Sequence, residues 1–103
     1  MEMAEVNIIN KALANATRLQ ILQWLKEPEK QFEPHQDLGH FNDGVCVQHI
    51  RKKVGLSQST SSHYLSLLLI ADLVEQTRHG KWTYYKRNEK TIKAYTTKLL
   101  NEL

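Results

Sequence analysis

The sequence predicts one mainly α-helical domain that carries a small β-hairpin in its C-terminal third. Apolar residues recur at helical spacing in about five segments, whereas two short runs of strand-forming residues flank a turn at His79-Gly80. A chain of 103 residues with 41% hydrophobic content is long enough for one core but not for two. Residues 1–103 are therefore expected to form a single domain.

Two helices are predicted before a long connection. The first, Met3–Ala14, has two apolar stripes, one with Met3, Val6, Ile9 and Leu13 and the other with Ala4, Ile8 and Ala12. Asn15 can cap the second helix, which runs from Thr17 to about Lys26. Residues 27–44 are polar and interrupted by proline and glycine, which indicates a connection with room for a short helical turn. A third helix is predicted from about Val45 to Lys53.

Residues 55–57 predict a tight turn into a fourth helix. Gly55 can adopt a positive φ, Leu56 can fill the corner, and Ser57 can cap the helix from Gln58 to about Ala71. One side of this helix is polar, with Gln58, Ser59, Ser62, His63 and Ser66, and the other holds Ser61, Tyr64, Leu65, Leu67 and Leu68. Such a polar side can meet the donors and acceptors of a DNA major groove, or it is an ordinary solvated face.

The C-terminal third predicts a hairpin and a last helix. Strands are expected at Val74–Arg78 and Trp82–Arg87, joined by His79-Gly80, and a helix from about Glu89 to Asn101. A helix-turn-helix followed by a hairpin is a winged helix-turn-helix, here with about five helices and a two-stranded wing. The basic wing tip, with Arg78, His79 and Lys81, suits contact with DNA phosphates or the minor groove, although charged hairpin tips are also common without function.

The composition limits the classes of function that this chain can have. Lys and Arg number 14 against 11 Asp and Glu, a net charge of +3 that permits a nucleic-acid partner. No apolar stretch approaches the ~20 residues that cross a bilayer, no secretory signal is evident, and one cysteine excludes an intrachain disulfide. We therefore expect a cytoplasmic protein that does not enter membranes. No nucleophile elbow, phosphate loop or acid/base pair indicates an enzyme.

Three blocks together resemble the ArsR/SmtB family of bacterial transcriptional repressors. They are Ala12-Leu13-Ala14-Asn15-Ala16-Thr17-Arg18-Leu19-Gln20-Ile21-Leu22, then Gly55-Leu56-Ser57-Gln58-Ser59-Thr60-Ser61-Ser62-His63-Tyr64-Leu65, then Gly80-Lys81-Trp82-Thr83-Tyr84-Tyr85. The resemblance implies a homodimeric repressor that binds an imperfect palindrome in double-stranded DNA and is released by an inducer. It implies base reading by Gln58, Ser59, Ser62 and His63, backbone contacts by Ser57 and Thr60, and wing contacts by Arg78 and Lys81.

The terminal helices, 3–14 and 89–101, are the predicted dimer interface. Their apolar stripes would leave hydrophobic surface exposed on so small a domain, and the same elements form the interface in the family. The residues expected there are Val6, Ile9, Leu13, Ile92, Tyr95 and Leu99. The alternative is that both helices wrap the single core.

The usual metal sites of the family are not evident. Of its paired cysteines only Cys46 is present, with Gln48 in place of the second, and the last helix contains no histidine. No cofactor is therefore expected, and the inducer is not indicated. The region 33–49 offers His35, His40, Cys46 and His49, with acidic Glu33, Asp37 and Asp43, as weak metal candidates. Cys46 is also a candidate redox sensor, or simply a buried core residue.

Two further departures concern the end of the fourth helix. Asp72 replaces the family's usual glycine, and aspartate tolerates the left-handed backbone that the turn needs. Leu69 and Ile70 fall on the polar side and require a cover, for which the 27–44 connection and a dimer partner are both candidates. A winged helix used for protein contact remains the alternative function.

Overall fold

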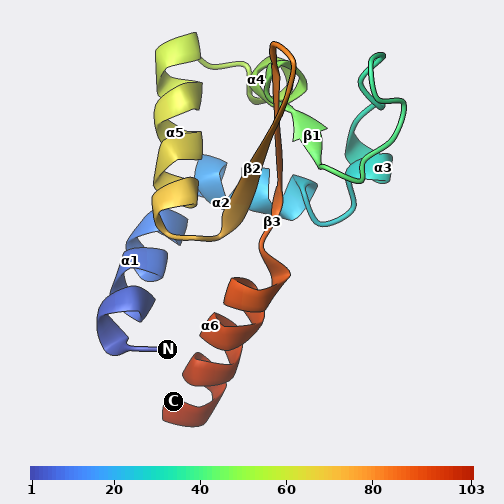
Figure 1. Ribbon diagram of the computed structural model, residues 1–103. Coiled ribbons are helices and arrows are strands. Elements are labelled where there is room, and N and C mark those ends of the chain that lie inside the picture. Colours follow the sequence, from blue (N-terminus) through green and yellow to red (C-terminus); the bar gives the residue numbers. More distant parts are fainter.

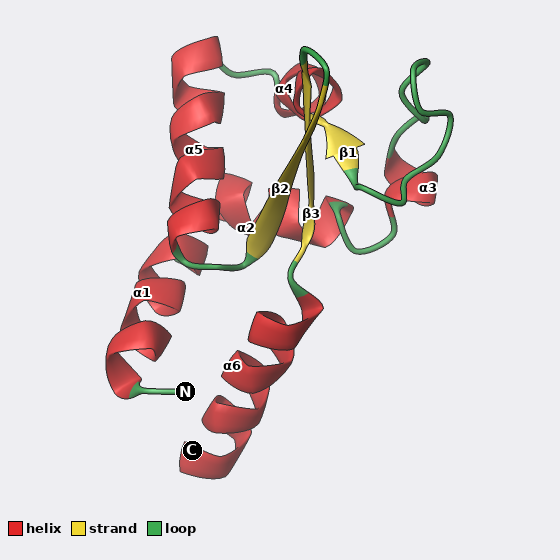
Figure 2. Ribbon diagram, in the orientation of Figure 1, coloured by secondary structure: helices red, strands yellow, loops and turns green.

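The computed structural model describes residues 1–103 as six helices and a three-stranded antiparallel sheet (Figures 1 and 2). The helices are α1 (Met3–Leu13), α2 (Ala16–Trp24), α3 (Pro28–Gln31), α4 (Val47–Val54), α5 (Gln58–Ile70) and α6 (Glu89–Glu102). The strands are β1 (Val45–Cys46), β2 (Val74–His79) and β3 (Trp82–Arg87), in the order β1-β3-β2. The predicted winged helix-turn-helix is thereby confirmed, with α3 as the short turn inside the long connection.

One hydrophobic core lies where α1, α2, α4 and α5 meet the sheet. Its most deeply buried members include Ile21, Ile50, Leu65, Leu68 and Leu73, which come from α2, α4, α5 and the turn before β2. Helical spacing places the buried residues of α5 on one side, as the sequence predicts. Burial of this face holds α5 in place and leaves its opposite face free.

The predicted start of the third helix is wrong. Val45 and Cys46 form strand β1, which pairs with Tyr85 and Tyr84 of β3, and the helix begins only at Val47. Gly44 enters this pairing with φ 100°, and a Cβ there would lie 2.1 Å from the backbone oxygen of Tyr85. Only glycine allows so close an approach between the two backbones. The wing therefore has a third strand, supplied from the end of the 27–44 connection.

The turns follow the sequence with one adjustment. Asn15 caps α2 by accepting from the Arg18 backbone N–H, and Asp72 adopts φ 61° after α5, as predicted. The wing turn, in contrast, lies one residue later than expected. His79 pairs with Trp82 at the end of β2, so the turn consists of Gly80 and Lys81, with Gly80 at φ 58°.

Helix α6 extends away from the rest of the chain (Figure 1). None of its 14 residues is fully buried, although Ile92 and Tyr95 near its first half pack against the core. Isolated helices of this length are only marginally stable in water. Because only Ile92 and Tyr95 of α6 pack against the core, the far half of the helix lacks a packing partner within one chain. No helix in the structure is both long and apolar enough to cross a membrane.

Candidate nucleic-acid interface

The turn between α4 and α5 positions the start of the recognition helix. Gly55, at φ 73°, ends α4, and the Ser57 hydroxyl caps α5 by accepting from the Thr60 backbone N–H at 3.1 Å. The same hydroxyl donates to the Thr60 hydroxyl oxygen at 2.8 Å. Ser57 and Thr60 therefore hold the first turn of α5. Leu56 does not fill the corner as predicted, because its side chain is 46% exposed.

The free face of α5 carries the expected polar side chains. Gln58, Ser59 and His63 are exposed, whereas Ser62 is half-buried and Ser61, on the other side, is fully buried. Ser62 differs from the others because its hydroxyl oxygen accepts from Arg51 Nη2 of α4 at 3.0 Å. Sequence reasoning missed Arg51, since no local pattern pairs it with a residue one helix later.

The wing places two basic side chains at its tip. Arg78 and Lys81 are exposed; Arg78 Nε donates to the Gly80 carbonyl at 3.1 Å, and Lys81 Nζ lies 5.0 Å from the centroid of the Trp82 ring. These contacts hold both side chains at the tip. His79 already has a partner within the chain, because its Nε2 lies 2.7 Å from Oδ2 of Asp43 in the 27–44 connection. The wing tip thus offers two cations rather than three basic residues.

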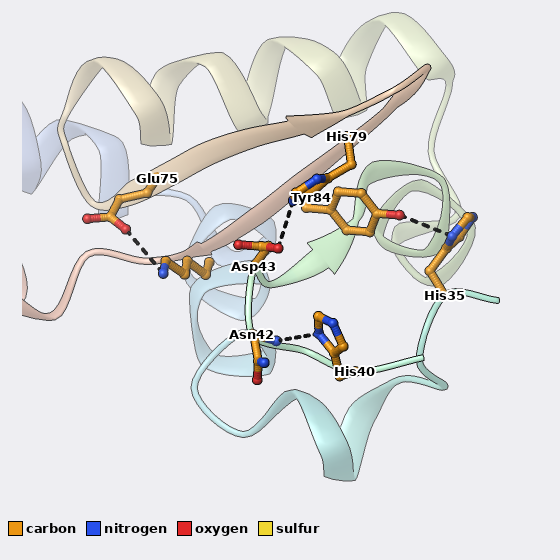
Figure 3. Close-up of polar contacts among 8 residues, drawn as sticks. His35, His40, Asn42, Asp43, Glu75, His79 and Tyr84 are labelled. Carbon is orange, nitrogen blue, oxygen red and sulfur yellow. Dashed lines mark hydrogen bonds and ion pairs between the residues drawn. The ribbon is translucent and has the colours of Figure 1, made fainter. Parts of the chain in front are cut away.

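The 27–44 connection packs against the outer side of the wing (Figure 3). Its His35 is buried, and His35 Nδ1 lies 3.1 Å from the Tyr84 hydroxyl oxygen. The His35 and Trp82 ring centroids lie 4.6 Å apart, with the rings tilted by 58°. Burial is the main cause that raises the pKa of Tyr84. The connection therefore supports the wing and does not cover Ile70, which lies beside α1 and α6.

The candidate metal ligands do not converge. No group of three His, Cys, Asp or Glu side chains in the chain has a geometry that could hold a metal ion. The His35 and His49 rings lie 5.5 Å apart, while His40 is exposed and its Nδ1 accepts from the Asn42 backbone N–H. Cys46 is a free thiol buried in β1, so a solution oxidant reaches it only if the sheet opens. Its place in the sheet favours the structural role among the alternatives.

The predicted dimer residues fall into two groups. Val6 and Ile9 are almost completely buried within one chain, so they cannot supply interface surface, and this part of the prediction is wrong. The reason is that Val6 and Ile9 lie on the side of α1 that its own chain covers, whereas Met3 of the same stripe is 52% exposed. Leu13, Ile92 and Tyr95 are partly buried against that core, and Leu99 is half-buried on α6.

Part of the second stripe of α1 remains open, although its Ala12 is buried in the core. Ile8 is exposed, and Ile70 at the end of α5 is 72% exposed. Both line a groove of about 600 Å³ between α1 and α6, together with Ala94. Acidic side chains, including Glu5 and Glu75, border the same groove. Part of the apolar surface that the chain leaves uncovered therefore lies at this groove, and more lies at the end of α6, where Leu100 and Leu103 are exposed.

The fold and this site define a winged helix-turn-helix protein with an exposed recognition helix. The chain is 54% identical over 82 residues to the uncharacterized HTH-type transcriptional regulator YbzH of Bacillus subtilis, covering 80% of this chain and 82% of that protein. It is also 38% identical over 78 residues to a candidate arsenical resistance operon repressor, ArsR2, of Halobacterium salinarum, covering 76% of this chain and 65% of that protein.

A solved structure agrees with these sequence relatives. The homodimeric winged helix-turn-helix DNA-binding domain Mb0332 of Mycobacterium bovis, a candidate ArsR-family regulator, is 27% identical, with a TM-score of 0.67 over 95% of this chain and 78% of that one. No protein-family model matches the chain. On the strength of its relatives and its fold, the chain belongs to the ArsR family of helix-turn-helix transcriptional regulators.

Proposed function

We propose that this protein is a homodimeric repressor that binds a palindromic DNA operator and blocks access to the promoter. The observation that carries the proposal is the exposed polar face of α5 beside two exposed cations of the wing. Gln58, Ser59 and His63 are free to meet base edges in the major groove, since none of them takes part in the core. Arg78 and Lys81 can reach the flanking phosphates or the minor groove.

The dimer is supported by the surface that one chain leaves open. One chain leaves Ile8 and Ile70 exposed at the groove between α1 and α6, and Leu100 and Leu103 exposed at the end of α6. Exposed large apolar side chains that gather on one part of a small domain commonly mark a protein interface. A second copy on a two-fold axis would cover the groove and present two recognition helices. The Mycobacterium bovis relative is described as homodimeric, which agrees with this arrangement.

A two-fold dimer makes a prediction about the operator. Two recognition helices that enter successive major grooves read half-sites ~34 Å apart, and their symmetry requires an inverted repeat. Repression would follow by occlusion, because a dimer bound across a promoter excludes RNA polymerase from the same DNA face.

Selection from a pool of random duplexes tests the proposal. The expected result is enrichment of one inverted repeat, bound by two chains per duplex, with both His63→Ala and Gln58→Ala relaxing base preference. A pool that shows no enriched sequence after repeated rounds would contradict sequence-specific binding. Binding of one chain per duplex would contradict the dimer.

A further inference from the structure

Arg51 links α4 to the reading face of α5. Its Nη2 donates to the Ser62 hydroxyl oxygen at 3.0 Å, across the helix-turn-helix. Ser62 is half-buried and lies on the same side of α5 as the exposed Ser59 and His63. The bond is therefore made directly beneath the face that the proposed function assigns to base reading.

The Arg51 side chain does not have a partner for each of its hydrogen-bond donors. Its Nε is buried and has no hydrogen-bond partner. A buried donor without a partner lowers the stability of the fold, and an apolar side chain of similar length would avoid that cost. Packing alone therefore does not explain why residue 51 is an arginine. A role for the positive charge of Arg51 beneath the reading face of α5 explains it.

The bond changes what Ser62 can recognise. A serine hydroxyl has one O–H donor and two acceptor lone pairs, and Arg51 occupies one lone pair. The O–H group then points away from the guanidinium. A donor that approached the remaining lone pair would bring its partial positive charge close to a fixed positive charge, which is unfavourable. Ser62 is thus biased toward donating its own hydrogen to an acceptor.

We propose that Arg51 is a specificity-determining residue, which acts through Ser62 to favour guanine at one position of each operator half-site. Guanine presents two acceptors on its major-groove edge, N7 and O6, and no donor. Thymine presents a single acceptor beside its methyl group, whereas adenine and cytosine each present an amino donor. Arg51 positions and polarises the hydroxyl, and Ser62 makes the base contact. The inference rests on the proposed function, because it requires that Ser62 meets a base.

The test compares selected operators of five proteins: the wild type, R51M, S62A, the double variant R51M/S62A and the matched control K52M. Lys52 is the next residue of α4, is exposed, and forms no hydrogen bond with Ser62, whose partner is Arg51, so K52M removes the same charge without removing that bond. R51M removes the unpartnered donor, and S62A places a strong helix former in α5, so both variants are expected to fold. Thermal unfolding checks this.

The wild type and K52M should enrich guanine at one position per half-site, by about tenfold over adenine and cytosine, the upper end of what one hydrogen bond contributes, and less strongly over thymine. R51M and S62A should each lower that enrichment to below about threefold and leave the other operator positions unchanged. The guanine enrichment of the double variant should equal that of either single variant. Guanine enrichment that persists in S62A or in R51M overturns the inference, and so does an equal loss of affinity for all sequences. A wild type that enriches no sequence overturns the proposed function instead.

Discussion

Replacement of Ile70 by serine should dissociate the proposed dimer without unfolding the chain. Ile70 is 72% exposed in one chain, so its side chain contributes little to the monomer core. Serine and isoleucine have similar helix propensities, and α5 should therefore keep its length. The substitution removes apolar surface only where a second copy would cover it.

The magnitude follows from the exposed fraction. Complete burial of an isoleucine side chain stabilises by about 1.5 to 3 kcal/mol, and the 72% that remains exposed corresponds to about 1 to 2 kcal/mol per chain. Two symmetric copies lose about 2 to 4 kcal/mol per dimer, which raises the dimer dissociation constant by about 30- to 700-fold.

Sedimentation equilibrium over a range of concentrations measures that constant directly, and far-UV circular dichroism verifies the fold. Leu56→Ser is the matched control, because Leu56 is also exposed but lies in the turn between α4 and α5, away from the groove. Its dissociation constant should equal that of the wild type. An unchanged constant for Ile70→Ser would refute the assignment of the groove as the interface.

Three further outcomes follow from the structure. Gly44→Ala should destabilise the fold by more than about 2 kcal/mol, because the new Cβ would meet the Tyr85 backbone. Gly39→Ala should cost only about 1 kcal/mol, because Gly39 has φ 68° but open space around it. Thermal denaturation compares the two variants, and equal losses of stability would contradict the close approach at Gly44. Lys81→Ala should weaken binding to all duplexes alike and reduce the slope of log affinity against log salt by about 1; a change in base preference would instead make Lys81 a base reader. Burial raises the pKa of Tyr84, so the folded state resists its ionisation and stability should fall as pH rises above about 10; Tyr84→Phe should show a shallower alkaline decline, and an identical decline would contradict the burial argument.

Local chemistry made most of the fold predictable. The cap at Asn15, the left-handed turn at Asp72 and the buried side of α5 each depend on neighbours within a few residues, and each is confirmed. Strand β1 depends on a partner strand about 40 residues later. The spacing of Val45 and Cys46 resembled the start of a helix, but pairing with β3 determines their conformation.

The site shows the same division between local and distant information. Exposure of Gln58, Ser59 and His63 follows from helix periodicity, so the exposed polar face of α5 could be located from the sequence. The bond between Arg51 and Ser62 joins two helices and leaves no periodic signal. In α1 the sequence shows two apolar stripes, and only the packing of the whole chain determines which of their residues are buried: Val6 and Ile9 of one stripe and Ala12 of the other.

The ratio of the affinities for two duplexes, measured at the same salt concentration, tests sequence-specific DNA binding most directly. Fluorescence anisotropy at a fixed, physiological salt concentration would compare the selected inverted repeat with a scrambled duplex of the same length and composition. The proposed function predicts that the repeat binds at least about 1,000-fold more tightly. Equal affinity for the two duplexes would contradict it, since phosphate contacts alone do not distinguish their sequences.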